Sequence, residues 1–268
     1  MTGVTFIETL HRGWRTVLFW SIAIGLTAIL QVVIIPDVAA LQQMAALLET
    51  LPPFLLQMFG GGDMEFLATA EGYLAIQYLG FMLVVFSAYG VVAGLNIMSN
   101  DEERGTLDVV LSLPIARWQL VAERFLAYVV LATALIALSF AFMLLGIAVT
   151  PALAVDLAPL LAANFAMVPP TILVMAFTVF LTAVLRRPIA IGIASALVLM
   201  SYFMDAIGRS LETQLGEVLR TISYYSYYDG TAVIQTGINW GNIAVLVVVT
   251  ALLFAGGLFF FQRRDVGV

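Results

Sequence analysis

The chain alternates between long apolar stretches without any charged side chain and shorter segments that hold its charges. A helix that crosses the hydrocarbon of a bilayer needs about 20 apolar residues, with about 17 to 25 tolerated. Each charge-free stretch is long enough for one such helix and too short for two. The pattern therefore predicts six membrane-spanning helices, at residues 16–36, 73–98, 125–149, 159–185, 188–206 and 241–261.

Composition excludes an ordinary soluble domain. Hydrophobic residues make up 62% of the chain and charged residues 10%, and the mean hydropathy is +1.05. Soluble domains carry about 25% charged residues. The strands of a transmembrane barrel would alternate polar and apolar residues, whereas these stretches are apolar on all sides. We therefore expect an all-α integral membrane protein with a single transmembrane domain over residues 1–268.

The arginines indicate how the chain is inserted. Arginine collects in short loops on the cytoplasmic side of a membrane, and an even number of spans places both termini on one side. The segments on that side hold nine of the eleven basic residues, all of them arginine, and the opposite segments hold Arg209 and Arg220. We therefore predict cytoplasmic termini, an outer loop at 37–72, a cytoplasmic segment at 100–118 and an outer segment at 207–235.

Aromatic and small residues suggest membrane anchors and packing contacts. Rings near span ends typically lie among lipid headgroups, so we expect interface anchors at Trp14, Trp118, Tyr224, Tyr225, Tyr227 and Tyr228. Small residues four apart let helices approach closely. Two such pairs predict packing within the subunit or, alternatively, an interface with a second subunit: Gly90 with Gly94, and Gly192 with Ala196. Pro169 and Pro170 should kink or break the fourth span.

Residues that several kinds of chemistry require are missing from the sequence. The chain has no cysteine and no lysine, which excludes disulfides, thiolate metal sites and the Walker A loop, whose lysine reaches the nucleotide phosphates. No charge stands at the middle of a span, which argues against an ion-coupled pathway. The outer acids are interpreted as a solvated face rather than a lipid-headgroup enzyme site: Asp205, Glu212, Glu217 and Asp229. We expect no catalytic residue, metal or cofactor in this chain.

The cytoplasmic segment between the second and third spans carries the most informative pattern. Asn100 is placed to cap a helix, and Glu103 follows three residues later, as in a capping box. Leu107, Val110 and Leu111 then share one face of this helix, and a proline ends it. Such a stripe can lie against lipid and the protein's own helices, or insert into a groove of a cytosolic partner. These residues alone leave both interpretations open.

The same segment resembles a known family. Residues 100–127, NDEERGTLDVVLSLPIARWQLVAERFLA, are similar to the loop between the second and third helices of ABC type 2 (ABC-2) transporter permeases, with an E-x-G-T-L stretch followed by a leucine-rich LSLP. The six-span layout and the tyrosine-rich outer segment resemble the family as well. In that family the segment is a coupling helix that docks on a separate ATPase subunit. The resemblance implies coupling roles for Glu102, Glu103, Arg104, Gly105, Thr106, Leu107, Val110 and Leu111.

The resemblance also implies partners and a function. Such permeases work as dimers with two ATPase subunits, so we expect a nucleotide-binding ATPase that holds ATP and magnesium, a second permease subunit and membrane lipid as partners, and no nucleic acid. The expected function is export of a hydrophobic or amphipathic substrate across the bacterial cell (inner) membrane. An alternative is a membrane component that uses ATP-driven motion to act on an extracytoplasmic partner without bulk transport.

Overall fold

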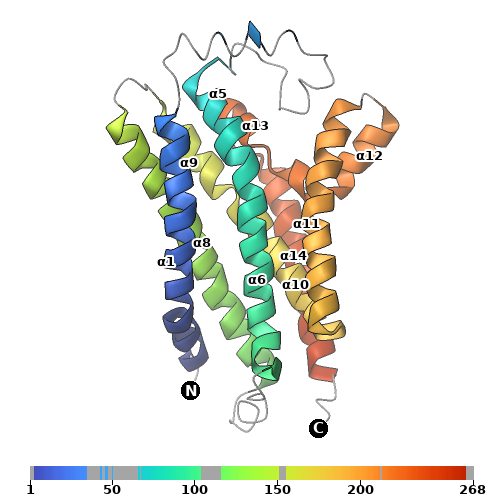
Figure 1. Cartoon of the computed structure of the whole chain (residues 1–268). Coiled ribbons are helices and arrows are strands. Elements are labelled where there is room, and N and C mark those ends of the chain that lie inside the picture. The colour runs from blue at the N-terminus through green and yellow to red at the C-terminus, as the bar shows by residue number, and fades with distance from the viewer. Residues whose placement is uncertain are drawn as a thin grey trace.

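The structure is a computed structural model and is almost entirely helical, with no strand in the part of the chain that it describes (Figure 1). The structure describes residues 3–34, 68–103, 116–150, 155–211 and 213–263, together with positions 43, 46, 47, 50 and 66. Within these ranges, residues 99–103 are described by their backbone alone.

Six helical spans are long and apolar enough to cross a membrane, which confirms the all-α fold with six spans predicted from the sequence. Two of the spans are composite, because a π-helical turn (η1) interrupts the second and a short break divides the fourth. In chain order the spans are α1 (Val4–Val33); α5 (Ala70–Leu74), η1 (Ala75–Gly80) and α6 (Phe81–Glu103); α8 (Arg117–Val149); α9 (Leu157–Phe165) and α10 (Val168–Val184); α11 (Arg187–Ser210); and α14 (Trp240–Arg263).

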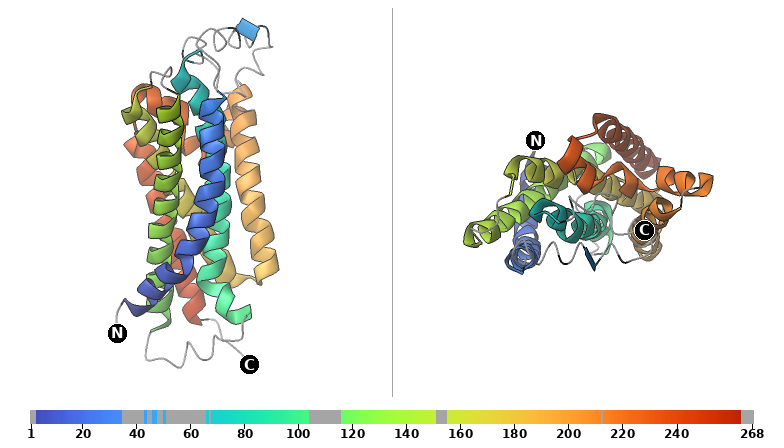
Figure 2. Two further views of the ribbon diagram at one scale, coloured as in Figure 1. Left: turned by 60° about the vertical axis from the view of Figure 1, so that its left-hand side comes forward. Right: turned by 90° about the horizontal axis from the view of Figure 1, so that it is seen from above.

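The spans run side by side, and both chain termini lie at the same end of the bundle (Figures 1 and 2). We call this the terminus end, and the opposite end the far end. Three short helices lie at the far end between the fifth and sixth spans: α12 (Gln214–Ile222), the 3-10 helix η2 (Tyr224–Tyr227) and α13 (Gly230–Thr236).

The centre of the bundle is α10, which packs against α6, α11, α14 and α8, while α1 packs along α8. Gly94 brings α6 and α10 close together, because a Cβ atom there would lie 2.6 Å from Thr178 Cβ and 2.7 Å from the carbonyl oxygen of Met175. A Cβ atom on Gly90 would lie 2.8 Å from the carbonyl oxygen of Thr171. The first small-residue pair therefore packs within the subunit.

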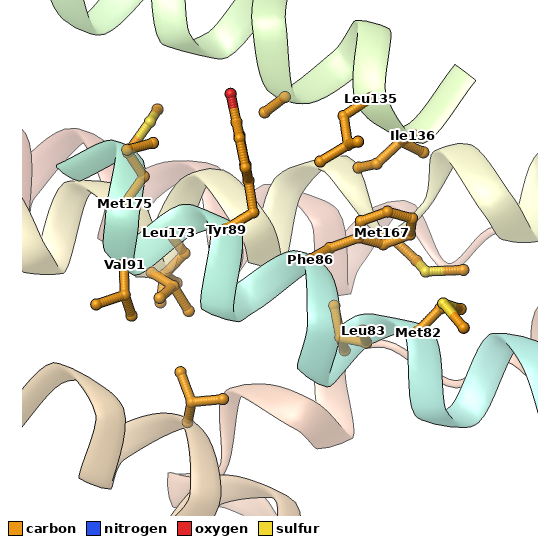
Figure 3. Close-up of a cluster of buried hydrophobic side chains, with 14 of the residues drawn as sticks. Met82, Leu83, Phe86, Tyr89, Val91, Leu135, Ile136, Met167, Leu173 and Met175 are labelled. Carbon is orange, nitrogen blue, oxygen red and sulfur yellow. The ribbon is translucent and has the colours of Figure 1, made fainter. Parts of the chain in front are cut away.

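A cluster of fully buried side chains joins α6, α8 and the fourth span (Figure 3). Phe86 of α6 points toward Ile136 of α8 and Met167, which precedes α10. Because lipid tails are as apolar as these side chains, close van der Waals contact contributes more to such a cluster than removal from water does. The cluster holds α6, α8 and the fourth span together at the middle of the bundle.

The predicted break in the fourth span is confirmed, whereas the predicted helix start at Asn100 is wrong. The fourth span breaks between Phe165 and Val168, as predicted, and its two prolines occupy the first turn of α10, where a missing N–H is tolerated. Asn100 does not cap a new helix, because α6 continues through it to Glu103. No glycine or proline stands between Ile97 and Glu103, so nothing interrupts the backbone hydrogen bonds there.

The second small-residue pair differs from the first. Gly192 and Ala196 are exposed on α11, and a Cβ atom on Gly192 would meet no described atom within 4 Å. The packing face of α11 is formed instead by residues such as Ala190, Ala194 and Val198, which are buried. Packing within the subunit therefore does not explain Gly192 and Ala196.

Candidate functional site

The helices on either side of the predicted coupling segment end and begin at the terminus end. There α6 ends at Glu103 and α8 begins at Arg117. Glu102 and Glu103 belong to the last turn of α6. The remaining predicted coupling residues lie outside the described residues, and the apolar stripe stays a prediction: Arg104, Gly105, Thr106, Leu107, Val110 and Leu111.

Two adjacent charged residues of α8 fix the helices on either side of this segment. Arg124 Nη1 donates a hydrogen bond to the carbonyl oxygen of Ile97 on α6, at 3.1 Å. The Glu123 carboxylate accepts from the backbone N–H groups of Gly3, at 2.9 Å, and Phe6, at 3.3 Å. A carboxylate at a helix start satisfies free amides and complements the helix dipole. The ends of α1, α6 and α8 are thereby joined where the segment begins and ends.

From the sequence, no role was assigned to Glu123, and Arg124 was counted only among the cytoplasmic arginines. The available signal was a pair of adjacent charges at the border of a long apolar stretch, where an unpaired charge is costly. Their partners could not be found from the sequence, because Gly3 lies 120 residues from Glu123 and Ile97 lies 27 residues from Arg124.

Two tryptophans lie near the terminus end. Trp14 of α1 and Trp118 of α8 are each about half exposed. The guanidinium carbon of Arg15 lies 5.8 Å from the ring centroid of Trp14, within the range of a cation–π contact. An exposed ring is free to meet lipid, so the anchor role of both tryptophans stays a prediction.

The tyrosines at the far end do not have the environment of interface anchors. Tyr224, Tyr225 and Tyr228 are at most 6% exposed, and only Tyr227 is partly exposed. Rings enclosed by protein cannot lie among lipid headgroups, so the anchor prediction is wrong for these three residues. Burial raises the pKa of all three hydroxyls above the usual value, which keeps them protonated.

Hydrogen bonds hold the buried tyrosines against the neighbouring spans. Tyr224 donates to Ser87 Oγ of α6 at 2.9 Å, and Tyr225 donates to the carbonyl oxygen of Gly80, the last residue of η1, at 3.0 Å. Ser223, which begins this segment, donates to the carbonyl oxygen of Ser201 on α11 at 2.7 Å. The segment therefore ties the second span to the fifth at the far end.

A charged triad, Asp205, Arg209 and Asp229, lies beside these tyrosines. Arg209 Nε donates to Asp205 Oδ2 at 2.9 Å, and Arg209 Nη1 donates to Asp229 Oδ2 at 2.7 Å. Burial by itself would raise the pKa of the Asp229 carboxyl, but the Arg209 charge together with hydrogen bonds from Arg209 and from the backbone N–H groups of Ala232 and Thr231 holds that pKa below the usual value. Asp205 is only 7% exposed. The prediction of a solvated acidic face is wrong for Asp205, which is buried. Asp229 is partly exposed and paired with Arg209, Glu217 is exposed as predicted, and Glu212 lies outside the described residues.

The comparisons with known proteins agree with the resemblance of the coupling segment. Residues 12–266 match the family model described as ABC-2 family transporter protein. No curated protein and no solved structure gives a significant match. A multi-pass chain of this family is the membrane component of an ATP-binding-cassette transporter and not its ATPase. Because the match extends over almost the whole chain and the fold has six spans, the chain belongs to the ABC-2 family of transporter proteins.

Proposed function

We propose that this chain is the permease subunit of an ATP-binding-cassette exporter in the bacterial cell (inner) membrane. It forms the path for a hydrophobic or amphipathic substrate, and it is driven through the predicted coupling segment at 100–118 by a separate ATPase subunit that holds ATP and magnesium. ABC-2 permeases generally work with an ATP-binding subunit, and the absence of lysine excludes a Walker A loop in this chain.

The distribution of arginine supports a cytoplasmic terminus end. The helix bounds bring Arg12, Arg117, Arg187 and Arg263 to that end, since they lie near the starts of α1, α8 and α11 and at the end of α14. The far end has Arg209 and Arg220 in the last turns of α11 and α12. Arginine near span ends favours the cytoplasmic side, where an ATPase would meet residues 100–118.

The single observation that carries the coupling proposal is the junction at the terminus end. Glu123 and Arg124 tie the start of α1 and the end of α6 to the first turns of α8. A force applied to a segment between α6 and α8 would therefore move three spans together. Rigid movement of packed helices is a common way to convert a local contact change into a global transition.

The chemistry of the spans supports an apolar or amphipathic substrate. The buried polar side chains described within them are uncharged, apart from Asp205 near the far end. The exposed face of α11, with Gly192 and Ala196 among large apolar side chains such as Ile193 and Met200, supports contact with a second permease subunit. We propose that the substrate path runs between the two subunits.

The coupling role is tested by replacing both Leu107 and Leu111 with aspartate in the full chain. Two charges on the apolar stripe should prevent docking, because charges are depleted from the buried core of protein interfaces. The measurement is co-purification, from native membranes, of a polypeptide that carries a Walker A loop.

A matched control places the same two charges on the opposite face of the predicted helix, as Val109→Asp and Ser112→Asp. This control should retain the ATPase subunit, whereas the stripe variant should lose it. Full retention by the stripe variant would contradict the docking role. ATP-dependent transport by reconstituted vesicles then separates an exporter from a complex that acts on an extracytoplasmic partner without transport.

A further inference from the structure

The far end contains a cavity that the coupling mechanism does not use. Its volume is about 350 Å³, within the range of about 300–1,000 Å³ typical of small-molecule sites. The cavity lies where the end of α1, the π-helical turn η1, the last turns of α11 and the start of α13 meet. Its lining combines apolar and aromatic side chains with the charged triad, and the apolar part includes Ile76, Phe81, Tyr202 and Tyr225.

Three residues that line the cavity each have a buried polar atom with no partner among the described residues. Asp205 uses Oδ2 to bind Arg209, but its buried Oδ1 accepts no hydrogen bond. The hydroxyl of Tyr228 is also buried and without a partner. Gln31 donates through Nε2 to the carbonyl oxygen of Gln77, which leaves Gln31 Oε1 unpaired. A buried polar atom without a partner is unfavourable, and more so if it is charged, so these atoms indicate a ligand that supplies hydrogen-bond donors.

The charge of the lining also favours a ligand that donates hydrogen bonds. Two carboxylates and one guanidinium line the cavity, which gives a net charge of one negative unit by formal count. Arg209 already directs Nε to Asp205 and Nη1 to Asp229. Arg220, the other arginine of this region, packs its side chain against Gly208 and is not part of the lining. An anion in this cavity would face the free Asp205 oxygen, whereas a cation with N–H groups would satisfy it.

We propose that this cavity binds an organic cation, in which a primary ammonium or guanidinium group donates to Asp205 and Tyr228 and an apolar body contacts Ile76, Phe81 and Tyr202. On the proposed function, this cation is the cargo, and the cavity is its last site before release at the far end. The cavity itself requires only the residues described here. Binding to the isolated chain therefore tests the site separately from the ATPase partnership.

The test is isothermal titration calorimetry of the full chain in phosphatidylcholine nanodiscs, with empty nanodiscs as the blank. The probes are benzylammonium, benzoate and benzyl alcohol, which share an aromatic ring and differ in charge. Benzylammonium should bind saturably and at least about tenfold more tightly than the other two, because a charge-assisted hydrogen bond to a buried carboxylate is among the stronger polar contacts. Equal binding of benzylammonium and benzoate would overturn the proposal.

Three variants locate the site. Asp205→Asn keeps the shape and an acceptor for Arg209 but removes the free carboxylate, and it should weaken benzylammonium binding at least about tenfold. Ala206→Leu narrows the cavity without changing its charge and should also abolish binding, which keeps the test decisive if Asp205→Asn does not fold. Glu217→Gln removes an exposed outer charge away from the lining and should change affinity less than twofold. Wild-type affinity in both cavity variants would refute the assignment.

The ammonium group could belong to a free amine or to a lipid headgroup. Nanodiscs that also contain phosphatidylethanolamine separate these sources. If the site binds the lipid headgroup, this lipid should compete and lower the apparent affinity of benzylammonium. If the site binds only free amines, that affinity should not change. If the chain binds benzylammonium but does not retain an ATPase, the cation site is supported and the proposed function is rejected. If the chain retains an ATPase but does not bind benzylammonium, the proposed function is supported and the cation site is rejected.

Discussion

Arg209 of α11 pairs with Asp205 on its own helix and with Asp229, which lies 20 residues later in the chain and precedes α13. The side chains of Asp205 and Asp229 are 10% and 30% exposed, so neither is well hydrated. Removing one partner of a buried ion pair costs about 3–5 kcal/mol, because the other charge is left uncompensated. The structure therefore makes Arg209 more important for stability than a surface arginine.

We expect Arg209→Gln to destabilise the protein by about 2–3 kcal/mol, somewhat less than for a fully buried pair, because 22% of the Arg209 side chain is exposed. The matched control is Arg12→Gln, which breaks an exposed pair with Glu8 and should cost less than about 1 kcal/mol. Thermal unfolding in non-ionic detergent, followed by tryptophan fluorescence, compares the two variants. Equal shifts in unfolding temperature would show that the triad has no special weight.

At the scale of elements, the six spans could be predicted because hydropathy and length suffice to define a membrane-crossing helix. The burial of Tyr224 could not, since its partner Ser87 lies 137 residues away and the 3-10 helix must first pack against α10, α11 and α14. The start of a new helix at Asn100 was predicted from a capping preference of about 1 kcal/mol. That preference is too small to end a helix that no glycine or proline interrupts.

The two small-residue pairs should respond oppositely to alanine. Gly94→Ala would place a methyl group 2.6 Å from Thr178 Cβ and 2.7 Å from a backbone carbonyl of α10, and the forced separation should cost about 1–3 kcal/mol. Gly192→Ala meets no described atom and should be neutral or slightly stabilising, since alanine favours helix. The measurement is the unfolding temperature of each variant. A destabilised Gly192→Ala with an unaffected Gly94→Ala would contradict the packing of α6 on α10.

At the scale of the whole molecule, the two ends of the bundle have different roles. The terminus end joins α1, α6 and α8 around the predicted coupling segment, and the far end has the buried triad and its cavity. The described part of α6 and η1 runs between these ends as one span, so movement at Glu103 would reach Gly80 through a continuous helix. A π-helical turn such as η1 often occurs at functional sites, which is consistent with a site at the far end.

The proposed division of work between two subunits is tested most directly by measuring ATP hydrolysis and ATP-dependent transport by the purified chain in liposomes, alone and together with its ATPase subunit. The chain alone should hydrolyse no ATP above the level of empty liposomes, because it lacks a Walker A loop. Both activities should appear only when the two subunits are combined. Hydrolysis or ATP-dependent transport by the chain alone would contradict the claim that it is a permease driven by a separate subunit.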